Sequence, residues 1–371
     1  MKFTLTLSPF SVECDSFVTK QGDSYLISAH QTLKDFNQLT YQQMLSELSS
    51  FTFVQITDVV KVFTDCHGQI PIQFTPSGFN MNNNGSQILP GVTTLNFTNN
   101  ELVFISYVQF EHRYYQITTD SLTNELKQEL QKIPEKPLIM LSGGVDSTLL
   151  FLCMLEMQIE FDAVTVSFVN TSPDQITVDQ ILEETTLLLE QKGLKKMFTH
   201  TKILVTEEAY KQQINQFKKQ FENLTVMDLN LLSVWHFATH QYNNKYIVSG
   251  LGPDEYLGGY KKIKGCSNQD EIKALIQKQI EQTHNKNIIR DFKFANSSNK
   301  ILVYPYLAYN VTQIFQKLIE TDMEEIKNKK PVRDPIFAFG YNEQIFNRDK
   351  RAAQFGSGAA KIIKSGGYDF V

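Results

Sequence analysis

The sequence has few cysteines and no pattern that would pair them. Its four cysteines, Cys14, Cys66, Cys153 and Cys266, are widely separated, and none belongs to a Cys-x-x-Cys motif. Dispersed thiols argue against a structural zinc site and against a disulfide framework, and they are typical of a reducing compartment. We therefore expect four buried or incidental thiols.

Long apolar runs and clusters of basic residues are also missing. No apolar segment approaches the ~20 residues that a transmembrane helix needs. The run Met1–Leu7 alternates like a β-strand and lacks the continuous apolar core of a signal peptide. The formal net charge is −5 without a basic stripe, so the charge does not indicate a nucleic acid or an anionic membrane as partner. We expect a cytoplasmic protein.

The chain is long enough for two domains, and the pattern of the first 118 residues is rich in β-strands. It has 371 residues, of which 42% are hydrophobic and 20% charged, as in ordinary globular proteins. Short alternating runs separated by turn-forming residues predict strands at Phe53–Ile56, Val59–Phe63, Thr93–Phe97 and Leu102–Tyr107. Helical spacing is confined to Tyr41–Leu48. We place a domain boundary at residues 118/119.

Strand and helix patterns alternate after that boundary. A helix is predicted at Ser121–Gln131, and further helices at Thr148–Met157, Val178–Lys192 and Asp228–Tyr242. Buried strands are predicted at Pro137–Leu141, Ala163–Val169 and Tyr246–Val248, and residues 265–371 are mostly helical in pattern. This order predicts an α/β domain with a parallel sheet and helices on both faces.

Two glycine-rich segments each follow a predicted strand. Ser142–Ser147 reads Ser-Gly-Gly-Val-Asp-Ser and precedes a helix, so its glycines and exposed N–H groups suit a phosphate. Ser249–Tyr260 is the second segment and contains the carboxylates of Asp254 and Glu255. We assign Asp146 and Asp254 to Mg²⁺ on a pyrophosphate, because carboxylate oxygens are ligands of that ion. The Walker pattern Gly-x-x-x-x-Gly-Lys-Ser/Thr is absent.

The two segments together resemble the synthetase domain of asparagine synthetases, which are ATP pyrophosphatases that cleave between the α and β phosphates. The resemblance covers roughly residues 135–364, and within this range Tyr304–Leu307 also resembles a segment of the family. Pro173–Thr177 and Lys350–Ser357 resemble the eukaryotic asparagine synthetase domain-containing proteins. Asp65–Ile72 and Leu89–Gly91 are similar to the late part of the family's glutaminase domain.

The resemblance implies a fold and a set of site residues. Residues 119–371 would form an adenine nucleotide α-hydrolase-like synthetase domain, and residues 1–118 a reduced glutaminase-like αββα domain. ATP and Mg²⁺ would be bound, with a third metal ligand at Asp291 and catalytic candidates at Lys350 and Arg351. The nucleotide-binding residues implied are Leu141, Ser142, Gly143, Gly144, Asp146, Ser147, Ser167, Ser249, Gly250 and Gly252.

Several positions depart from the family pattern. The glutaminase nucleophile would be a cysteine at position 2, but this residue is Lys2, and Cys14 lies too far along the chain to replace it. The glutamate implicated in amide formation is Leu251, which cannot transfer a proton. The stretch Ile301–Ala308 has lost three charged groups of the family. These changes affect the predicted site of the acceptor substrate and leave the predicted ATP site intact.

The function predicted is an ATP-dependent, AMP-forming amide ligase that adenylates a small carboxylate, with aspartate favoured and ammonia as the attacking amine. Asparagine biosynthesis and a homodimer are implied by the resemblance alone. A nucleotide-binding pseudoenzyme with a scaffold or regulatory role is the main alternative. Two other pyrophosphatase reactions are less favoured. β-Lactam closure would favour a tyrosine at position 251, and tRNA thiolation would favour paired cysteines or a basic face.

Overall fold

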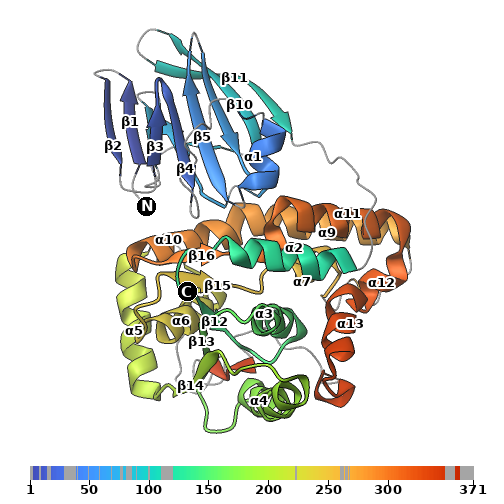
Figure 1. Ribbon diagram of the computed structural model, residues 1–371. Coiled ribbons are helices and arrows are strands. Elements are labelled where there is room, and N and C mark those ends of the chain that lie inside the picture. Colours follow the sequence, from blue (N-terminus) through green and yellow to red (C-terminus); the bar gives the residue numbers. More distant parts are fainter. Residues whose placement is uncertain are drawn as a thin grey trace. The chain divides into compact units, whose positions relative to one another are not determined.

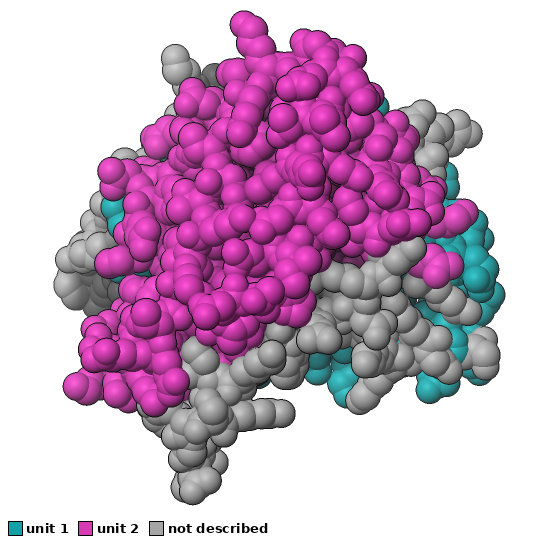
Figure 2. Space-filling model, turned by 90° about the horizontal axis from the view of Figure 1, so that it is seen from below, with its two compact units in different colours: residues 1–134, 254–327 teal, residues 135–253, 328–371 magenta. Residues whose placement is uncertain are grey.

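The protein is described by a computed structural model, which divides into two compact units. Residues 3–346 are described, except for 8, 9, 15–17, 29–38, 40, 49, 58, 68, 76, 77, 81–85, 89, 99, 100, 110–119, 222, 223, 260–262, 264, 265 and 267, and residues 356–359 are described as well. Unit 1 comprises residues 1–134 and 254–327, and unit 2 comprises 135–253 and 328–371; Figure 2 colours them separately. The predicted boundary at 118/119 lies outside the described residues and stays a prediction.

Unit 2 contains the predicted parallel sheet. Its strands are β12 (Leu138–Met140), β13 (Phe161–Ser167), β14 (Phe198–Leu204) and β15 (Tyr246–Val248), in the spatial order β14-β13-β12-β15. Every neighbouring pair among them is parallel. The chain moves outward from β12 through β13 to β14, and then returns to the other side of β12 as β15. In such sheets, ligands bind beyond the carboxyl ends of the strands where the order reverses.

Helices lie on both faces of this sheet, as predicted (Figure 1). They are α3 (Val145–Glu156), α4 (Pro173–Lys192), α5 (Glu207–Gln220), α6 (Val226–Thr239) and α13 (Lys330–Phe339), with a short 3₁₀ turn η4 (Glu343–Phe346). Figure 1 shows α3 and α4 on one side and α5 and α6 on the other. Polar side chains cap the N-termini of two of these helices: Ser172 caps α4, and Thr225 with Asp228 forms a capping box on α6.

Unit 1 contains two antiparallel sheets. The strands are β1 (Phe3–Leu7), β2 (Phe10–Cys14), β3 (Val18–Gln21), β4 (Ser24–Ser28), β5 (Phe51–Ile56), β6 (Val60–Thr64), β7 (Gln73–Thr75), β8 (Gly78–Asn80), β9 (Ser86–Gln87), β10 (Gly91–Thr98) and β11 (Glu101–Gln109). Their orders are β2-β1-β8-β7-β9 and β11-β10-β6-β5-β4-β3. The four predicted strands are confirmed as β5, β6, β10 and β11. The αββα layering stays a prediction.

The rest of unit 1 is largely helical. Its elements are α1 (Tyr41–Glu47), α2 (Asp120–Gln131), α7 (which begins at Pro253 and ends at Tyr256), α9 (Gln269–Gln282), a π-helical turn η2 (Thr283–Ile288), α10 (Ile289–Ser297), β16 (Ile301–Val303), η3 (Pro305–Leu307), α11 (Tyr309–Thr321) and α12 (Met323–Lys327). A buried cluster packs α1 against β4 and β5 and against the start of α11. The helices described include none that is both long enough and apolar enough to cross a bilayer.

Candidate nucleotide site

The first glycine segment forms a tight turn between β12 and α3. The Ser142 N–H donates to Ser147 Oγ at 3.3 Å, and the Ser147 hydroxyl donates to the carbonyl of Gly144 at 3.1 Å. Gly144 is the N-cap of α3, and no side chain caps this helix. The N–H groups in the first turn of an α-helix and the helix dipole favour an anion at this end of α3.

Glycine is required at Gly143 for two reasons. Its φ is +71°, which lies in the left-handed region, and a Cβ atom there would lie 2.9 Å from Cβ of Thr177. The start of α4 thus packs directly on the loop Ser142–Ser147. Pro173–Thr177, one of the segments that carried the family resemblance, supports the loop from this side.

The second glycine segment meets the first within unit 2. A Cβ atom on Gly250 would lie 3.3 Å from the backbone nitrogen of Ser147 and 3.5 Å from Cβ of Asp146. Ser249, which precedes it, follows β15 and accepts a hydrogen bond from the Leu251 N–H at 3.3 Å. A longer side chain at position 250 would enter the start of α3. The structure therefore places the two motifs against each other where the strand order reverses.

A lysine that the sequence reasoning missed lies on this junction. Lys329 Nζ is 2.9 Å from both carboxylate oxygens of Asp146, and both side chains are less than a tenth exposed. Lys329 has a φ of +52° and is the N-cap of α13, a helix that packs on α3. Lys329 thus combines a buried charge with a left-handed backbone that non-glycine residues seldom adopt. The sequence contains no local signal for this ion pair, because 183 residues separate Lys329 from Asp146.

The C-terminal segment 356–359 belongs to the same neighbourhood. The Phe168 N–H donates to the Ser357 carbonyl at 2.8 Å, and a Cβ atom on Gly356 would overlap the carboxylate of Asp174. Gly356 therefore has to be glycine at this close approach to α4. Gly356 and Ser357 thus contact the start of α4 and the residue that follows β13. Part of the predicted motif Lys350–Ser357 therefore lies beside α4, the helix that packs on the loop Ser142–Ser147.

The remaining nucleotide-binding candidates of unit 2 lie at the same edge of the sheet. Leu141 is buried, and its carbonyl accepts from the Thr165 hydroxyl at 2.8 Å. Ser167 ends β13 and donates its hydroxyl to the Val169 carbonyl at 2.5 Å. Gly252 has a φ of +132°. Their predicted roles in binding stay predictions.

The other candidates lie elsewhere. Asp254 and Asp291 belong to unit 1, so their predicted part in a shared metal site stays a prediction. The Asp291 carboxylate accepts from Arg290 Nε at 2.8 Å and is buried. Lys350 and Arg351 lie outside the described residues, as do Lys2 and Tyr260.

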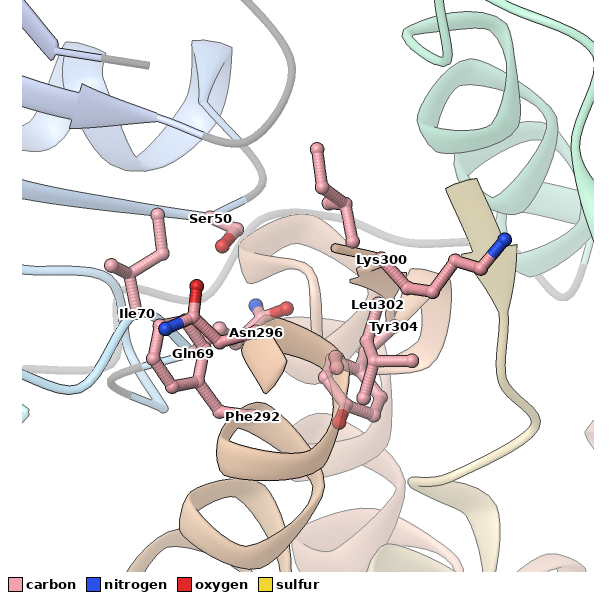
Figure 3. A pocket seen from close by; sticks show the side chains of 10 residues that line it. Ser50, Gln69, Ile70, Phe292, Asn296, Lys300, Leu302 and Tyr304 are labelled. Atoms are coloured by element: carbon pink, nitrogen blue, oxygen red, sulfur yellow. The ribbon is translucent and has the colours of Figure 1, made fainter. Parts of the chain in front are cut away.

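A small cavity in unit 1 is too small to hold a nucleotide. It has a volume of about 20 Å³, which is room for one water molecule. Gln69 and Ser50 line it from the β-rich part, and Asn296 and Tyr304 line it from the α10–β16 part (Figure 3). Among the described residues no partner is found for the buried Tyr304 hydroxyl, and burial raises its pKa well above the ordinary value. One bridging water would satisfy this group.

Comparison with known proteins identifies relatives that align with more than two thirds of this chain. The sequence model described as "Asparagine synthase" matches residues 108–328, more than half of the chain. An asparagine synthetase domain-containing protein of Saccharomyces cerevisiae is 23% identical over 343 residues, which cover 84% of this chain and 64% of the relative. A Methanocaldococcus jannaschii protein, provisionally named as a glutamine-hydrolysing asparagine synthetase, is 25% identical over 296 residues, covering 68% of this chain and 52% of the relative.

The chain thus spans less than two thirds of the length of these two relatives. Among solved structures, the NMN synthetase from Francisella tularensis aligns with a TM-score of 0.29 and 14% identity, covering 63% of this chain and 96% of that one. The NH₃-dependent NAD synthetase from Campylobacter jejuni aligns with a TM-score of 0.25 and 18% identity, covering 61% and 96%.

Proposed function

Because the chain belongs to the asparagine synthase family, we propose that it is an ATP-dependent, AMP-forming amide ligase. The observation that carries this proposal is the junction in unit 2, where Gly250 packs on the backbone of Asp146 and Ser147 and Lys329 pairs with the Asp146 carboxylate. This junction combines helix N–H groups, hydroxyls, an ammonium and a carboxylate at one edge of a parallel sheet. Such a set suits a magnesium-bound polyphosphate.

The residues present fit the Mg²⁺ ion that the family implies. The buried Asp146 carboxylate would offer an oxygen ligand that this ion prefers once the Lys329 ammonium, which lies 2.9 Å from both of its oxygens in this structure, turns to the phosphates. Asp254 follows the second loop in the chain. In the proposed complex Asp146 would hold the ion, and Asp254 is the proposed second ligand. When bound, Mg²⁺ neutralises negative charge on the phosphates.

The chain's own groups have separate tasks in the proposed reaction. A carboxylate oxygen of the substrate attacks the α-phosphorus of ATP, and the bond to the β-phosphate oxygen breaks, which releases pyrophosphate. The N–H groups at the start of α3, the hydroxyls of Ser142 and Ser147 and the Lys329 ammonium stabilise the charge that develops on the departing pyrophosphate. Ammonia then attacks the acyl carbon and AMP leaves. Aspartate is the proposed substrate, and free ammonia is the proposed nitrogen source.

Release of AMP and pyrophosphate from Mg-ATP by the purified chain tests this proposal. It is measured with and without aspartate and ammonium, for the wild type, Asp146→Asn and the control Asp162→Asn. Asp162 is a matched carboxylate at the other end of the strands, where Lys136 pairs with it at 2.8 Å. We expect aspartate-dependent release with formation of asparagine, lost in Asp146→Asn and kept in Asp162→Asn.

Two other outcomes would contradict the proposal in different ways. Binding of Mg-ATP without release, under any acceptor tried, would favour a nucleotide-binding protein without catalysis, the alternative that Leu251 motivates. Absence of Mg-ATP binding would refute the nucleotide site itself.

A further inference from the structure

The buried carboxylate of Asp65 lies at the centre of a turn that includes Cys66, His67 and Gln69. Asp65 is 2% exposed and accepts backbone hydrogen bonds from His67 at 2.9 Å and from Phe51 at 3.2 Å. The Gln69 N–H also donates to it. Asp65, Cys66 and His67 could together reach a metal ion, but backbone donors already occupy the carboxylate. The carboxylate therefore shapes the turn.

The turn contacts residues more than 180 positions later in the same unit. His67 Nε2 lies 2.7 Å from the hydroxyl of Tyr256, and His284 Nδ1 lies 2.6 Å from the His67 carbonyl. Gln69 Nε2 donates to the carbonyl of Leu307 at 3.3 Å. Three helical or turn elements of the later segment are thus tied to one short turn of the β-rich part.

The direction of the His67–Tyr256 hydrogen bond depends on the tautomer of His67. When Nδ1, which lies 3.1 Å from Cys66 Sγ, carries the proton, Nε2 accepts the phenol proton of Tyr256. Burial raises the pKa of Tyr256 well above its ordinary value, so the phenol keeps its proton. In either tautomer the phenol and the imidazole are partners of each other.

Tyr256 is the last residue of α7, two positions after Asp254. It is 2% exposed and its ring lies 5.4 Å from that of Phe315. The Gly259 N–H donates back to the Asp254 carbonyl at 3.1 Å, which closes the turn after α7. A helix of four residues has little stability of its own, so the anchor at Tyr256 fixes the direction of the Asp254 backbone.

We propose that His67 is a positioning residue for the second nucleotide loop, acting through Tyr256 on α7 and thereby on Asp254. The inference rests on the proposed function, because it takes Asp254 as a ligand of the magnesium-bound nucleotide. It assigns to the β-rich part a task that needs no glutaminase nucleophile. The β-rich part holds Tyr256 and the turn after α7 in place.

Hydrogen–deuterium exchange and Mg-ATP affinity of the full chain test this. The variants are His67→Leu, which leaves the buried Tyr256 donor unsatisfied, His67→Gln, which keeps an acceptor, and Thr52→Val as a control. Thr52 donates to the Ile70 carbonyl at 2.8 Å in the same β-rich part, so the hydrogen bond that this control removes does not involve α7. For His67→Leu we expect about tenfold faster exchange over 254–259 and about tenfold weaker Mg-ATP binding. His67→Gln restores most of both, and Thr52→Val changes neither by more than about twofold.

Pairing with Tyr256→Phe shows whether His67 acts through the phenol. In the Tyr256→Phe background, His67→Leu should have less than about a twofold further effect, because both partners are then apolar. Unchanged exchange at 254–259 in His67→Leu, or an equal effect in both backgrounds, would overturn the positioning role. A wild-type chain that binds no Mg-ATP would refute the proposed function instead, and with it the nucleotide-directed purpose of the contact.

Discussion

Replacing Lys329 with methionine should destabilise unit 2 strongly, although the ion pair it forms adds little net stability. At 2.9 Å and an effective dielectric of 20, the attraction between the ammonium and the Asp146 carboxylate is about 6 kcal/mol. Removing two charges from water costs several kcal/mol per ion, so the two effects nearly cancel. Lys329→Met removes the attraction and leaves the buried Asp146 carboxylate without its ammonium partner. We expect the free energy of unfolding to fall by about 3–5 kcal/mol.

The assay is urea unfolding followed by fluorescence of the single tryptophan, Trp235, which is buried on α6 and reports on unit 2. The double variant Lys329→Met/Asp146→Asn should recover most of the loss, because a neutral pair replaces the unpaired charge. Lys330→Met, at an exposed neighbouring position, is the control and should change stability by less than about 0.5 kcal/mol. A loss below about 1 kcal/mol in Lys329→Met, with an additive double variant, would refute the buried pair.

Two further predictions concern the same unit. Gly143→Ala should lower the free energy of unfolding by about 1–2 kcal/mol because of its left-handed backbone, and by more because of the overlap with Thr177; it should also weaken Mg-ATP binding. Gly193→Ala is the control, because its φ is +63° but no atom lies within 4 Å of an added Cβ, so it carries the backbone cost alone. Equal losses of stability in the two variants would contradict the overlap at Gly143. His200, bonded to Thr165, has a pKa lowered to about 4 by burial, so its contribution to stability is present above pH 6.5 and is lost as the pH falls towards 4. As the pH is lowered over that range, the midpoint of urea unfolding should therefore fall less steeply in His200→Gln than in the wild type. Equal pH dependence of the two midpoints would contradict the lowered pKa of His200.

The fold of unit 2 could be predicted largely because its central elements are apolar and periodic. The strands at β12, β13 and β15 and the helices α3, α4 and α6 were all expected, with ends differing by a few residues. β14 and α5 were not. β14 is the edge strand, with only Phe198 and Ile203 buried, so its pattern lacks the run of apolar residues that marks a central parallel strand.

The Asp146 half of the candidate site could be predicted because its signal is local. A strand, two glycines and a helix start lie within ten residues, and their spacing alone favours an anion site. The Lys329 half has no such signal. Its surroundings, Lys327 to Lys330, read as a solvated basic run, and neither its burial nor its left-handed backbone can be seen in the sequence.

The difference between the two halves bears on what the departures from the family mean. Leu251 and the apolar stretch Ile301–Ala308 remove charges at positions where an acceptor would be handled, and the residues of that stretch are buried in unit 1, which suits their apolar character. A buried apolar pair would be about as stable as the Lys329–Asp146 ion pair, so stability alone does not account for two charges buried at a glycine loop. The pair therefore supports the proposal that this loop binds a charged nucleotide, whatever acceptor receives its adenylyl group.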